Sequence, residues 1–283
     1  MLPVIDARTR GSRTGGRGRR RLLWGVAAVV GVLAVAAGVA YLVLRDPARP
    51  VTVDEARERF RDGGEAAPAG GGDAPPAGVY VYATTGYEQV DALTGSRHDY
   101  PEETTGTLTA AEGGCLRWRW EPLRQRWDEE LLCPADGGAW ARPETALFHS
   151  FFNQDETRAY ECTGDPYVPP PDAEPGTTFA WTCDSPGSEH SGDSHEDGTG
   201  EVVGVESVEV DGVERDALRV HYETAVSGDS TGGGELEVWY SLDRWPLVLR
   251  QVREGGNASE TVIGTVNYEE AYELMLTAWD PLR

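Results

Sequence analysis

The 283-residue sequence contains no lysine. All 25 of its basic residues are arginine, which, with abundant alanine, glycine and valine, is typical of high-GC bacterial coding. It also has no cysteine before Cys115, which excludes a lipid-modified cysteine at the end of an amino-terminal apolar segment. A fully disordered chain is not expected, because nine Trp and eleven Tyr can fill a core, although 35 Gly and 18 Pro indicate long irregular segments.

The motifs of several enzyme classes are missing as well. There is no GxSxG elbow, HExxH helix, glycine-rich phosphate loop, GxGxxG fingerprint or EF-hand loop. Among the five histidines, His221 alternates with apolar residues and is expected to be a satisfied sheet residue rather than a base. Adjacent acids such as Glu129–Glu130 and Glu269–Glu270 point to opposite faces of a strand, so they predict no acid/base pair. We therefore expect no catalytic residue and no bound cofactor.

A long apolar segment lies near the amino terminus. Residues 22–44 (LLWGVAAVVGVLAVAAGVAYLVL) contain no charge and no proline. A helix of this length rises about 34 Å, enough to cross a hydrocarbon core of about 30 Å. Trp24 and Tyr41 lie near its ends, where amphipathic rings favour the membrane interface. The alternative is a cleaved signal peptide, whose apolar region is normally only about 7–15 residues long. We expect an uncleaved transmembrane helix over residues 22–44 that binds the lipid bilayer.

Charge differs strongly on the two sides of this segment. Residues 1–45 hold eight Arg and one acid, or +7, so residues 46–283 carry −23 − 7 = −30. The positive-inside rule therefore places the basic tail, residues 1–21, in the cytoplasm and the carboxyl-terminal part outside the cell membrane. So much negative charge repels phosphate groups, and we expect no nucleic-acid partner. Solubility or adaptation to salt accounts for the acidity more simply than a surface for a basic partner.

The cysteines agree with an external location. Cys115, Cys133, Cys162 and Cys183 all follow the apolar segment, and an even number in an oxidising compartment favours disulfides. Of the three possible pairings we favour the sequential one, which closes two short loops and stabilises each by about 3 kcal/mol in the chain-entropy model. The alternative is a zinc site, but the sequence has no CxxC spacing.

Residues 45–77 are expected to connect the membrane helix to the folded domain. Within them, residues 51–62 predict a short amphipathic helix, with Thr52 as N-cap and Glu55 at the spacing of a capping box. Residues 63–78 are rich in Gly, Ala and Pro and predict a flexible spacer. Whether the short helix packs on the domain or on a partner is left open.

Residues 78–283 predict an extracytoplasmic domain that is mainly β. In residues 115–121, Leu116, Trp118 and Trp120 alternate with arginines, which is typical of a strand with one buried face. Asp211-Gly212 between two alternating runs is the strongest short hairpin signal. Residues 268–279 fit either a helix or a strand. The later predicted strands are residues 201–210, 213–226, 235–241, 245–254 and 261–268, with a glycine-rich loop at 227–234 and a turn at 255–257.

These strands form an antiparallel meander, which predicts a curved sheet or half-barrel carried on one amino-terminal transmembrane helix.

One polar segment interrupts the pattern. Residues 184–200 include His190, Asp193 and His195 in a His-x-x-Asp-x-His spacing, which offers ligands for a divalent cation. The segment has no apolar anchor, so we expect a solvated loop rather than a metal site.

A family resemblance is carried by residues 235–252 (ELEVWYSLDRWPLVLRQV), followed by a glycine-broken hairpin and Ile-Gly-Thr-Val-Asn-Tyr at 263–268. This stretch resembles the closing strands of the LolA/LppX-type half-barrel. The order of anchor, spacer and GVYVYATTG opening resembles single-pass envelope proteins of high-GC bacteria. The resemblance covers a short part of the chain and implies a concave sheet that holds a lipid or peptide segment. It implies no functional residue.

Three hypotheses about function follow. The first is a tethered binding or sensing module for a hydrophobic envelope ligand or a protein partner. The second is a structural or assembly protein, in which the apolar helix and residues 51–62 recruit a membrane or envelope protein. The third is an enzyme acting on envelope polymers, which the missing motifs make the least favoured. A sheet that encloses an apolar cavity would distinguish the first hypothesis from the others.

Overall fold

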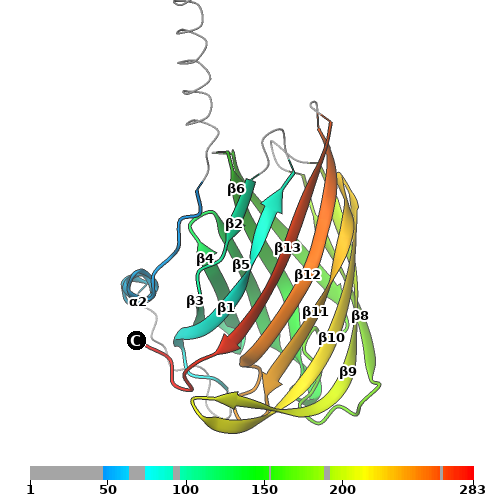
Figure 1. Cartoon of the computed structure of the whole chain (residues 1–283). Coiled ribbons are helices and arrows are strands. Elements are labelled where there is room, and N and C mark those ends of the chain that lie inside the picture. Colours follow the sequence, from blue (N-terminus) through cyan, green and yellow to red (C-terminus); the bar gives the residue numbers. More distant parts are fainter. Residues whose placement is uncertain (1–46, 64–73, 92–95, 153, 188–191, 262–263) are drawn as a thin grey trace, which may run out of the picture. The chain divides into compact units, whose positions relative to one another are not determined.

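Thirteen antiparallel strands form a single sheet in the computed structural model (Figure 1). The structure describes residues 47–63, 74–91, 96–152, 154–187, 192–261 and 264–283, which all belong to one compact unit, residues 46–283. The predicted transmembrane helix and the basic tail lie outside the described residues, as does most of the predicted spacer. The strands are β1 (Gly78–Val90), β2 (Ser96–Asp99), β3 (Glu103–Ala110), β4 (Leu116–Leu123), β5 (Arg126–Pro134), β6 (Trp140–Phe151), β7 (Gln154–Gly164), β8 (Thr178–Ser185), β9 (Ser194–Val210), β10 (Val213–Gly228), β11 (Ser230–Ser241), β12 (Val248–Thr261) and β13 (Gly264–Leu276).

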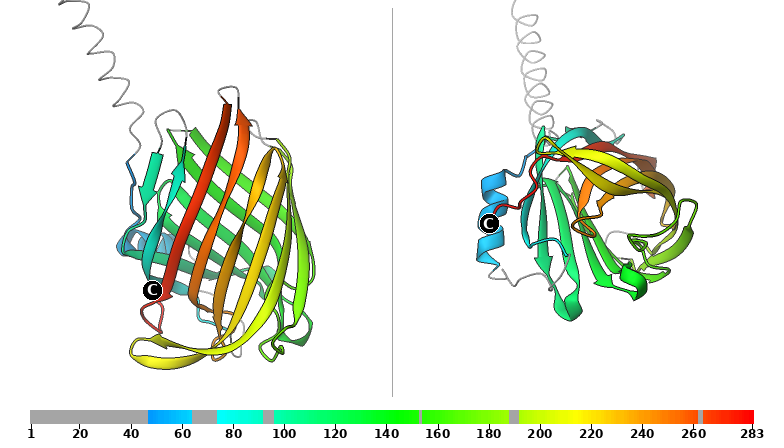
Figure 2. Two further views of the ribbon diagram at one scale, coloured as in Figure 1. Left: turned by 45° about the vertical axis from the view of Figure 1, so that its right-hand side comes forward. Right: turned by 90° about the horizontal axis from the view of Figure 1, so that it is seen from below.

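The sheet closes on itself. Strands neighbour one another in chain order from β3 to β13, and β1 pairs with β13 over residues 82–90 and 268–276. The other edge of β1 pairs with β3 along its first half and with β2 along its second half. All strands except β2 therefore form a closed antiparallel barrel of twelve strands, seen from below in the right-hand view of Figure 2.

The closed barrel corrects the expected curved sheet or half-barrel. The reason lies in the segment after Tyr268, which could have been a helix but forms strand β13 with Tyr272, Leu274 and Leu276 buried on one face. Because β13 pairs with the opening strand β1, neither strand leaves a row of unpaired backbone N–H and C=O groups at a sheet edge.

The predicted hairpin is confirmed, while three segments expected as loops or turns are strands. Asp211 and Gly212, with φ of 54° and 72°, form the two-residue turn between β9 and β10. The expected loop at 227–234 and the turn at 255–257 lie mostly within β10, β11 and β12, and the later part of the expected loop at 184–200 is the start of β9. Partner strands on both sides satisfy the backbone of these segments, which outweighs the low strand preference of glycine.

Glycines on the inner face of β9 make room for aromatic rings of β8. Gly198 lies opposite Trp181 and Gly200 lies opposite a phenyl ring, Phe179. A Cβ atom at Gly198 would overlap the Trp181 indole, and one at Gly200 would overlap the Phe179 ring. The aromatic rings therefore cover the glycine backbone, which explains how a Gly-rich polar segment becomes a strand with one buried face.

Both disulfides form in the sequential pairing that the sequence favours. Cys115–Cys133 joins the segment before β4 to β5, with a Cα–Cα distance of 4.1 Å. Cys162–Cys183 joins directly opposite residues of β7 and β8, with a Cα–Cα distance of 4.0 Å. The described residues contain no free cysteine.

The short helix α2 (Val53–Asp62) forms as predicted and packs on the outside of the barrel. Thr52 is its N-cap, and Thr52 and Glu55 make both hydrogen bonds of a capping box. Its buried residues Ala56 and Phe60 cluster with Val79 of β1, and Ala77 and Leu282 complete the cluster. Of the two roles left open for this helix, packing on the domain is the one observed.

The chain before α2 is fastened to the turn between β4 and β5. The buried amide of Gln125 donates a hydrogen bond to the backbone oxygen of Pro47 (2.8 Å) and accepts one from the backbone N–H of Arg49 (2.9 Å). Pro50 forms an isolated antiparallel bridge with Leu123. This segment therefore pairs over a short length with the backbone at the end of β4.

Replacing Gly198 by alanine should destabilise the protein, because the added methyl group overlaps the Trp181 ring inside a packed wall. We expect a loss of about 1–3 kcal/mol in the free energy of unfolding. Urea unfolding of the full chain, followed by circular dichroism, measures this loss. Asp197→Ala, at the next and outward-facing position, is the control and should change stability by less than about 0.5 kcal/mol. Equal losses in the two variants would contradict the ring–glycine contact.

Candidate functional site

A cavity of about 610 Å³ lies inside the barrel. Its lining comes from alternate residues of many strands, because successive side chains of a barrel strand point inward and outward in turn. Part of the lining is apolar and aromatic, and part is charged. Glycines of β11 and β12, which carry no side chain, also line it. The principal apolar lining residues are Leu108, Leu116, Trp118, Trp120, Leu132, Leu236, Val238, Tyr240, Leu247 and Val248.

Aromatic side chains pack together beside the apolar part of the cavity. The Trp245 indole lies 5.7 Å from the Tyr240 ring and donates a hydrogen bond to the backbone oxygen of Gly138 (3.0 Å). Tyr222 stacks on Tyr167 at a ring-centroid distance of 4.9 Å. The apolar part of the cavity thus rests on a packed aromatic floor.

Charged side chains form a charge belt around the cavity. Its first group centres on Arg126, whose two Nη atoms donate to both oxygens of Asp128 (2.6 and 2.7 Å). Arg126 Nε also donates to Glu270 (3.0 Å), which accepts a further hydrogen bond from the Tyr100 hydroxyl (2.5 Å). Arg253 contacts the second oxygen of Glu270 at 3.3 Å. We define the charge belt as Arg126, Asp128, Glu130, Arg142, Glu196, Arg253 and Glu270.

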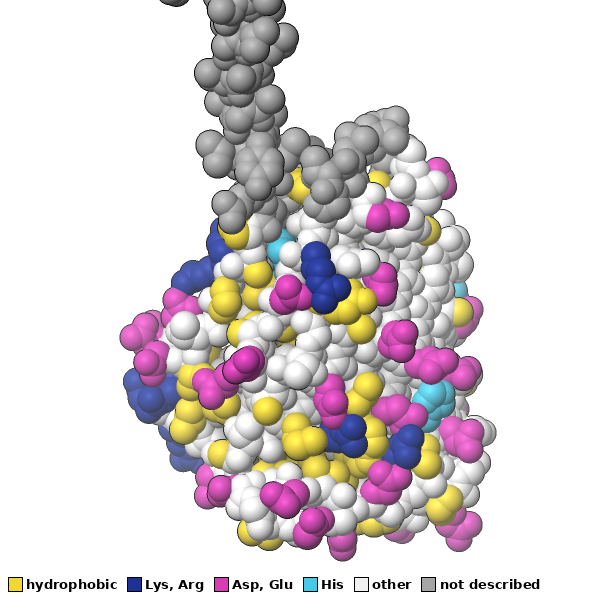
Figure 3. Space-filling view, in the orientation of Figure 1, with side chains coloured by type: hydrophobic (Ala, Val, Ile, Leu, Met, Phe, Trp, Pro, Cys, Tyr) yellow, Lys and Arg dark blue, Asp and Glu magenta, His cyan; other side chains and the backbone are white. Residues whose placement is uncertain are grey.

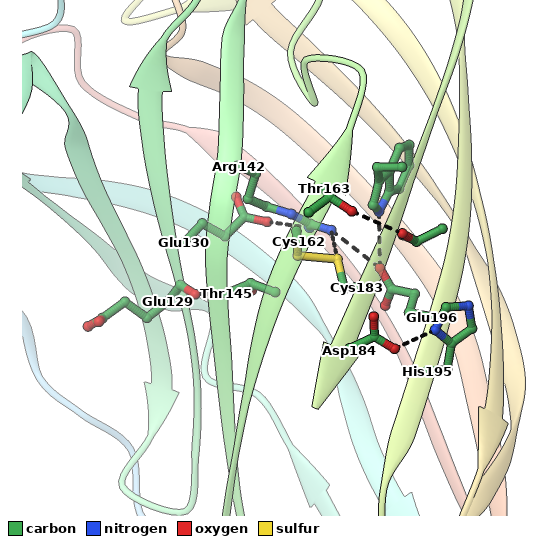
Figure 4. Close-up of a disulfide and its surroundings, with 12 residues drawn as sticks. Glu129, Glu130, Arg142, Thr145, Cys162, Thr163, Cys183, Asp184, His195 and Glu196 are labelled. Carbon is green, nitrogen blue, oxygen red and sulfur yellow. Dashed lines mark hydrogen bonds and ion pairs between the residues drawn. A yellow bond between two sulfur atoms is a disulfide. The ribbon is translucent and has the colours of Figure 1, made fainter. Parts of the chain in front are cut away.

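The second group of the charge belt centres on Arg142 (Figure 4). Arg142 donates to Glu130 (3.1 Å) and to Glu196 (3.3 Å), and it lies 3.5 Å from the Cys183 sulfur of the disulfide. Its guanidinium also lies 3.9 Å from the centre of the Tyr167 ring. One arginine therefore joins β6 to β5 and β9 across the inside of the barrel.

The members of the charge belt differ in how much of each side chain reaches the cavity. Arg126, Arg142 and Glu270 are 3–8% exposed and are held by their partners. The reachable carboxylates are those of Asp128 (30%), Glu130 (25%) and Glu196 (21%), and the reachable cation is Arg253 (37%). A ligand in the cavity would meet these four groups first.

Electrostatics acts differently on Glu130 and Glu270 of the charge belt. Lost hydration raises the pKa of Glu130 above its ordinary value, because Arg142 and Arg253 do not fully offset it and the charge of Asp128 acts in the same direction. Burial acts in the same direction on Glu270, but Arg126 and Arg253 outweigh it and hold the pKa of Glu270 low.

A buried carboxylate between two histidines lies next to the charge belt. Glu88 is fully buried, and its oxygens lie 2.8 Å from His98 Nδ1 and 3.1 Å from His149 Nδ1. Burial alone would raise the pKa of Glu88, but the hydrogen bonds from His149 and His98, with the charge of Arg126, hold it at about 2. The His98 ring stacks on Phe151 at 4.8 Å, so this contact fastens β2 to β6.

The sequence pattern does not mark these inward charges as a site, although it predicts that Glu129 and Glu130, like Glu269 and Glu270, face opposite sides of a strand. His221 is hydrogen-bonded to Glu237 (2.9 Å), as expected for a satisfied sheet residue. His195 lies 2.7 Å from Asp184 and 3.2 Å from Asp197, while His190 lies outside the described residues. Within the part of the chain that the structure describes, no group of three or more His, Cys, Asp or Glu is placed to hold a metal ion.

A signal for the missed residues exists in strand β5. Arg126, Asp128 and Glu130 share the parity of Leu132, whose side chain belongs to the core. The expected split of adjacent acids is also observed: Glu129 pairs with arginines of the neighbouring strand, whereas Glu130 lines the cavity. The sequence therefore predicts that Arg126, Asp128 and Glu130 share one face of β5, but it does not show that this face lies inside a closed barrel.

Comparisons with known proteins show only distant similarity. No family model matches the chain, and no curated protein matches it. The crystal structure of the hypothetical lipoprotein YmcC from Escherichia coli K12 has 12% sequence identity and a TM-score of 0.35, covering 82% of this chain and 98% of that one. A putative lipoprotein from Parabacteroides distasonis has 12% identity and a TM-score of 0.31, covering 73% and 97%. None of the helices in the described ranges has the length and apolar character needed to span a membrane.

The pH dependence of stability should report the Glu88 contacts. Because the pKa of Glu88 falls from 4.5 to about 2 on folding, its stabilising effect is complete above pH 4.5 and is lost as the pH falls toward 2. This loss amounts to roughly 3 kcal/mol. Urea unfolding of the full chain between pH 7 and pH 2 should give a shallower acid slope for Glu88→Gln than for the wild type. The outward-facing variant Glu269→Gln should keep the wild-type slope, and an unchanged slope in Glu88→Gln would refute the assignment.

Proposed function

We propose that residues 46–283 are the extracytoplasmic binding module of a single-pass membrane protein, and that the barrel takes a hydrophobic envelope ligand into its cavity. The observation that carries this proposal is the cavity itself. Its volume of about 610 Å³ lies within the range of roughly 300–1,000 Å³ that is typical of small-molecule sites. Its apolar lining comes from strands on several sides of the barrel, as a site that surrounds its ligand requires.

The membrane part of the proposal rests on the sequence. Residues 22–44 would cross the cell membrane, with the arginine-rich residues 1–21 in the cytoplasm and the barrel outside. Two disulfides within the barrel support an oxidising location. Figure 3 shows acidic side chains scattered over the face that carries α2, β1 and β13, which would keep the domain away from anionic head groups.

The alternative, an assembly protein that recruits a partner through residues 51–62, is less well supported. An amphipathic helix needs a free apolar face to dock on a partner. In α2 the apolar residues Ala56 and Phe60 are already buried against the barrel. Binding within the cavity uses a surface that the described residues leave open, so it is the function we propose.

Photolabelling of the full chain in lipid nanodiscs tests this function. A dodecanol probe carrying a diazirine should cross-link to partly exposed cavity residues such as Trp118 and Leu236, as located by mass spectrometry of peptides. Val226→Trp places a large ring in the cavity and should lower this labelling about tenfold, equivalent to roughly 1.4 kcal/mol.

Ala225→Trp is the matched control, because residue 225 is exposed and Val226 lines the cavity. It should leave the labelling of interior peptides unchanged. Absence of interior labelling in the folded wild type, or equal labelling of both variants, would reject the proposed function.

A further inference from the structure

We infer that the ligand of this cavity is an amphiphile whose head group carries a protonated amine, with its hydrocarbon part against the apolar lining residues of the cavity. The inference rests on the proposed function and specifies its ligand class. It is carried by the position, accessibility and sign of the charges that line the cavity, and by their arrangement relative to the apolar lining.

The cavity is itself amphipathic. Apolar lining residues that are partly exposed, such as Trp118 and Leu236, offer a surface for a hydrocarbon chain, whose burial gains about 0.8 kcal/mol per CH₂ group. The charge belt lines the same continuous space. A purely apolar ligand would leave these charges facing hydrocarbon, whereas a ligand with one polar end satisfies both parts of the wall.

The sign of the lining favours a cation. Among the described residues, four arginines and six acids line the cavity, so the formal charge of this lining is 4 − 6 = −2. A narrow space with a low-dielectric wall concentrates such a field, which attracts a cation and repels an anion. An anionic amphiphile would therefore add a third uncompensated negative charge. The charged lining residues are Arg126, Arg142, Arg158, Arg253, Asp128, Glu130, Asp155, Glu156, Glu196 and Glu270.

Glu130 is the best-placed group for an ammonium. Its carboxylate accepts one hydrogen bond, from Arg142, although a carboxylate has about four acceptor positions. A quarter of the side chain faces the cavity. Burial raises the pKa of Glu130, and a cation bound beside it would favour the charged form of this carboxylate. Asp128, two residues along β5, is reachable from the same space but already accepts two hydrogen bonds from Arg126.

Arg253 is the feature that an anion would use. Its side chain is the most exposed of the charge belt, and its ion pair with Glu270 at 3.3 Å offsets its charge. Arg253 shares Glu270 with Arg126, and Arg126 also pairs with Asp128, so these two arginines and two carboxylates form a group with no net positive charge. If the cavity instead prefers an anionic head group, Arg253 is the residue on which that preference should depend.

Three photoactivatable dodecyl probes that differ only in the head group test this inference on the full chain in nanodiscs. The heads are ammonium, hydroxyl and carboxylate, and labelling of interior peptides is compared at equal membrane-bound concentration. We expect the ammonium probe to label about tenfold more than the carboxylate probe. Glu130→Gln should remove most of this preference, whereas Glu129→Gln, the neighbour that points outward, should preserve it.

Arg253→Gln gives a reciprocal test, since removing the reachable guanidinium should increase labelling by the ammonium probe. Labelling that favours the carboxylate and depends on Arg253 would overturn the inference. Equal labelling by all three heads would also overturn it while leaving the proposed binding function intact. Failure of every probe to label interior peptides would instead reject the binding function.

Discussion

The pairing of β1 with β13 is the constraint on which the rest of the structure depends. Without it, the inner face of the sheet would be an open concave surface where water solvates every charge. With it, each inward side chain lies in an enclosed space, and an unpaired charge there becomes costly. The tight partners of Arg126 and Glu270 follow from this closure, as does the shared use of Arg142 by two glutamates.

Such a charge belt is difficult to explain by stability alone. Replacing a buried ion pair by apolar residues of similar size is often neutral or stabilising, because desolvation offsets the attraction between the charges. The barrel could have been filled by the aromatic and aliphatic residues that form its floor. Retaining Asp128, Glu130 and Arg253 in contact with the cavity is consistent with a space that accommodates a polar group.

The sequence predicts local structure better than enclosure. The Asp211-Gly212 turn, the capping box of α2 and the alternation after Cys115 each depend on neighbouring residues, and each is observed. Closure depends on pairing between strands that lie almost two hundred residues apart, which no local pattern encodes. For the same reason, the alternation of side chains along β5 places Arg126 and Leu132 on one face of the strand but does not show whether that face lies inside a barrel. The glycine-rich segments form strands because of contacts with other strands: aromatic rings cover Gly198 and Gly200, and the backbones of neighbouring strands pair with residues 230–234 and 255–257.

The fastening of residues 47–51 to the β4–β5 turn has a mechanical consequence. Tension applied to the chain ahead of Pro47 is transmitted first to the Gln125 amide and to the short bridge at Leu123. Strand β1, which begins only at Gly78, is shielded from such a pull by these contacts and by the packed helix α2. A force on the chain ahead of Pro47 would thus reach the β1–β13 pairing only after these contacts had broken.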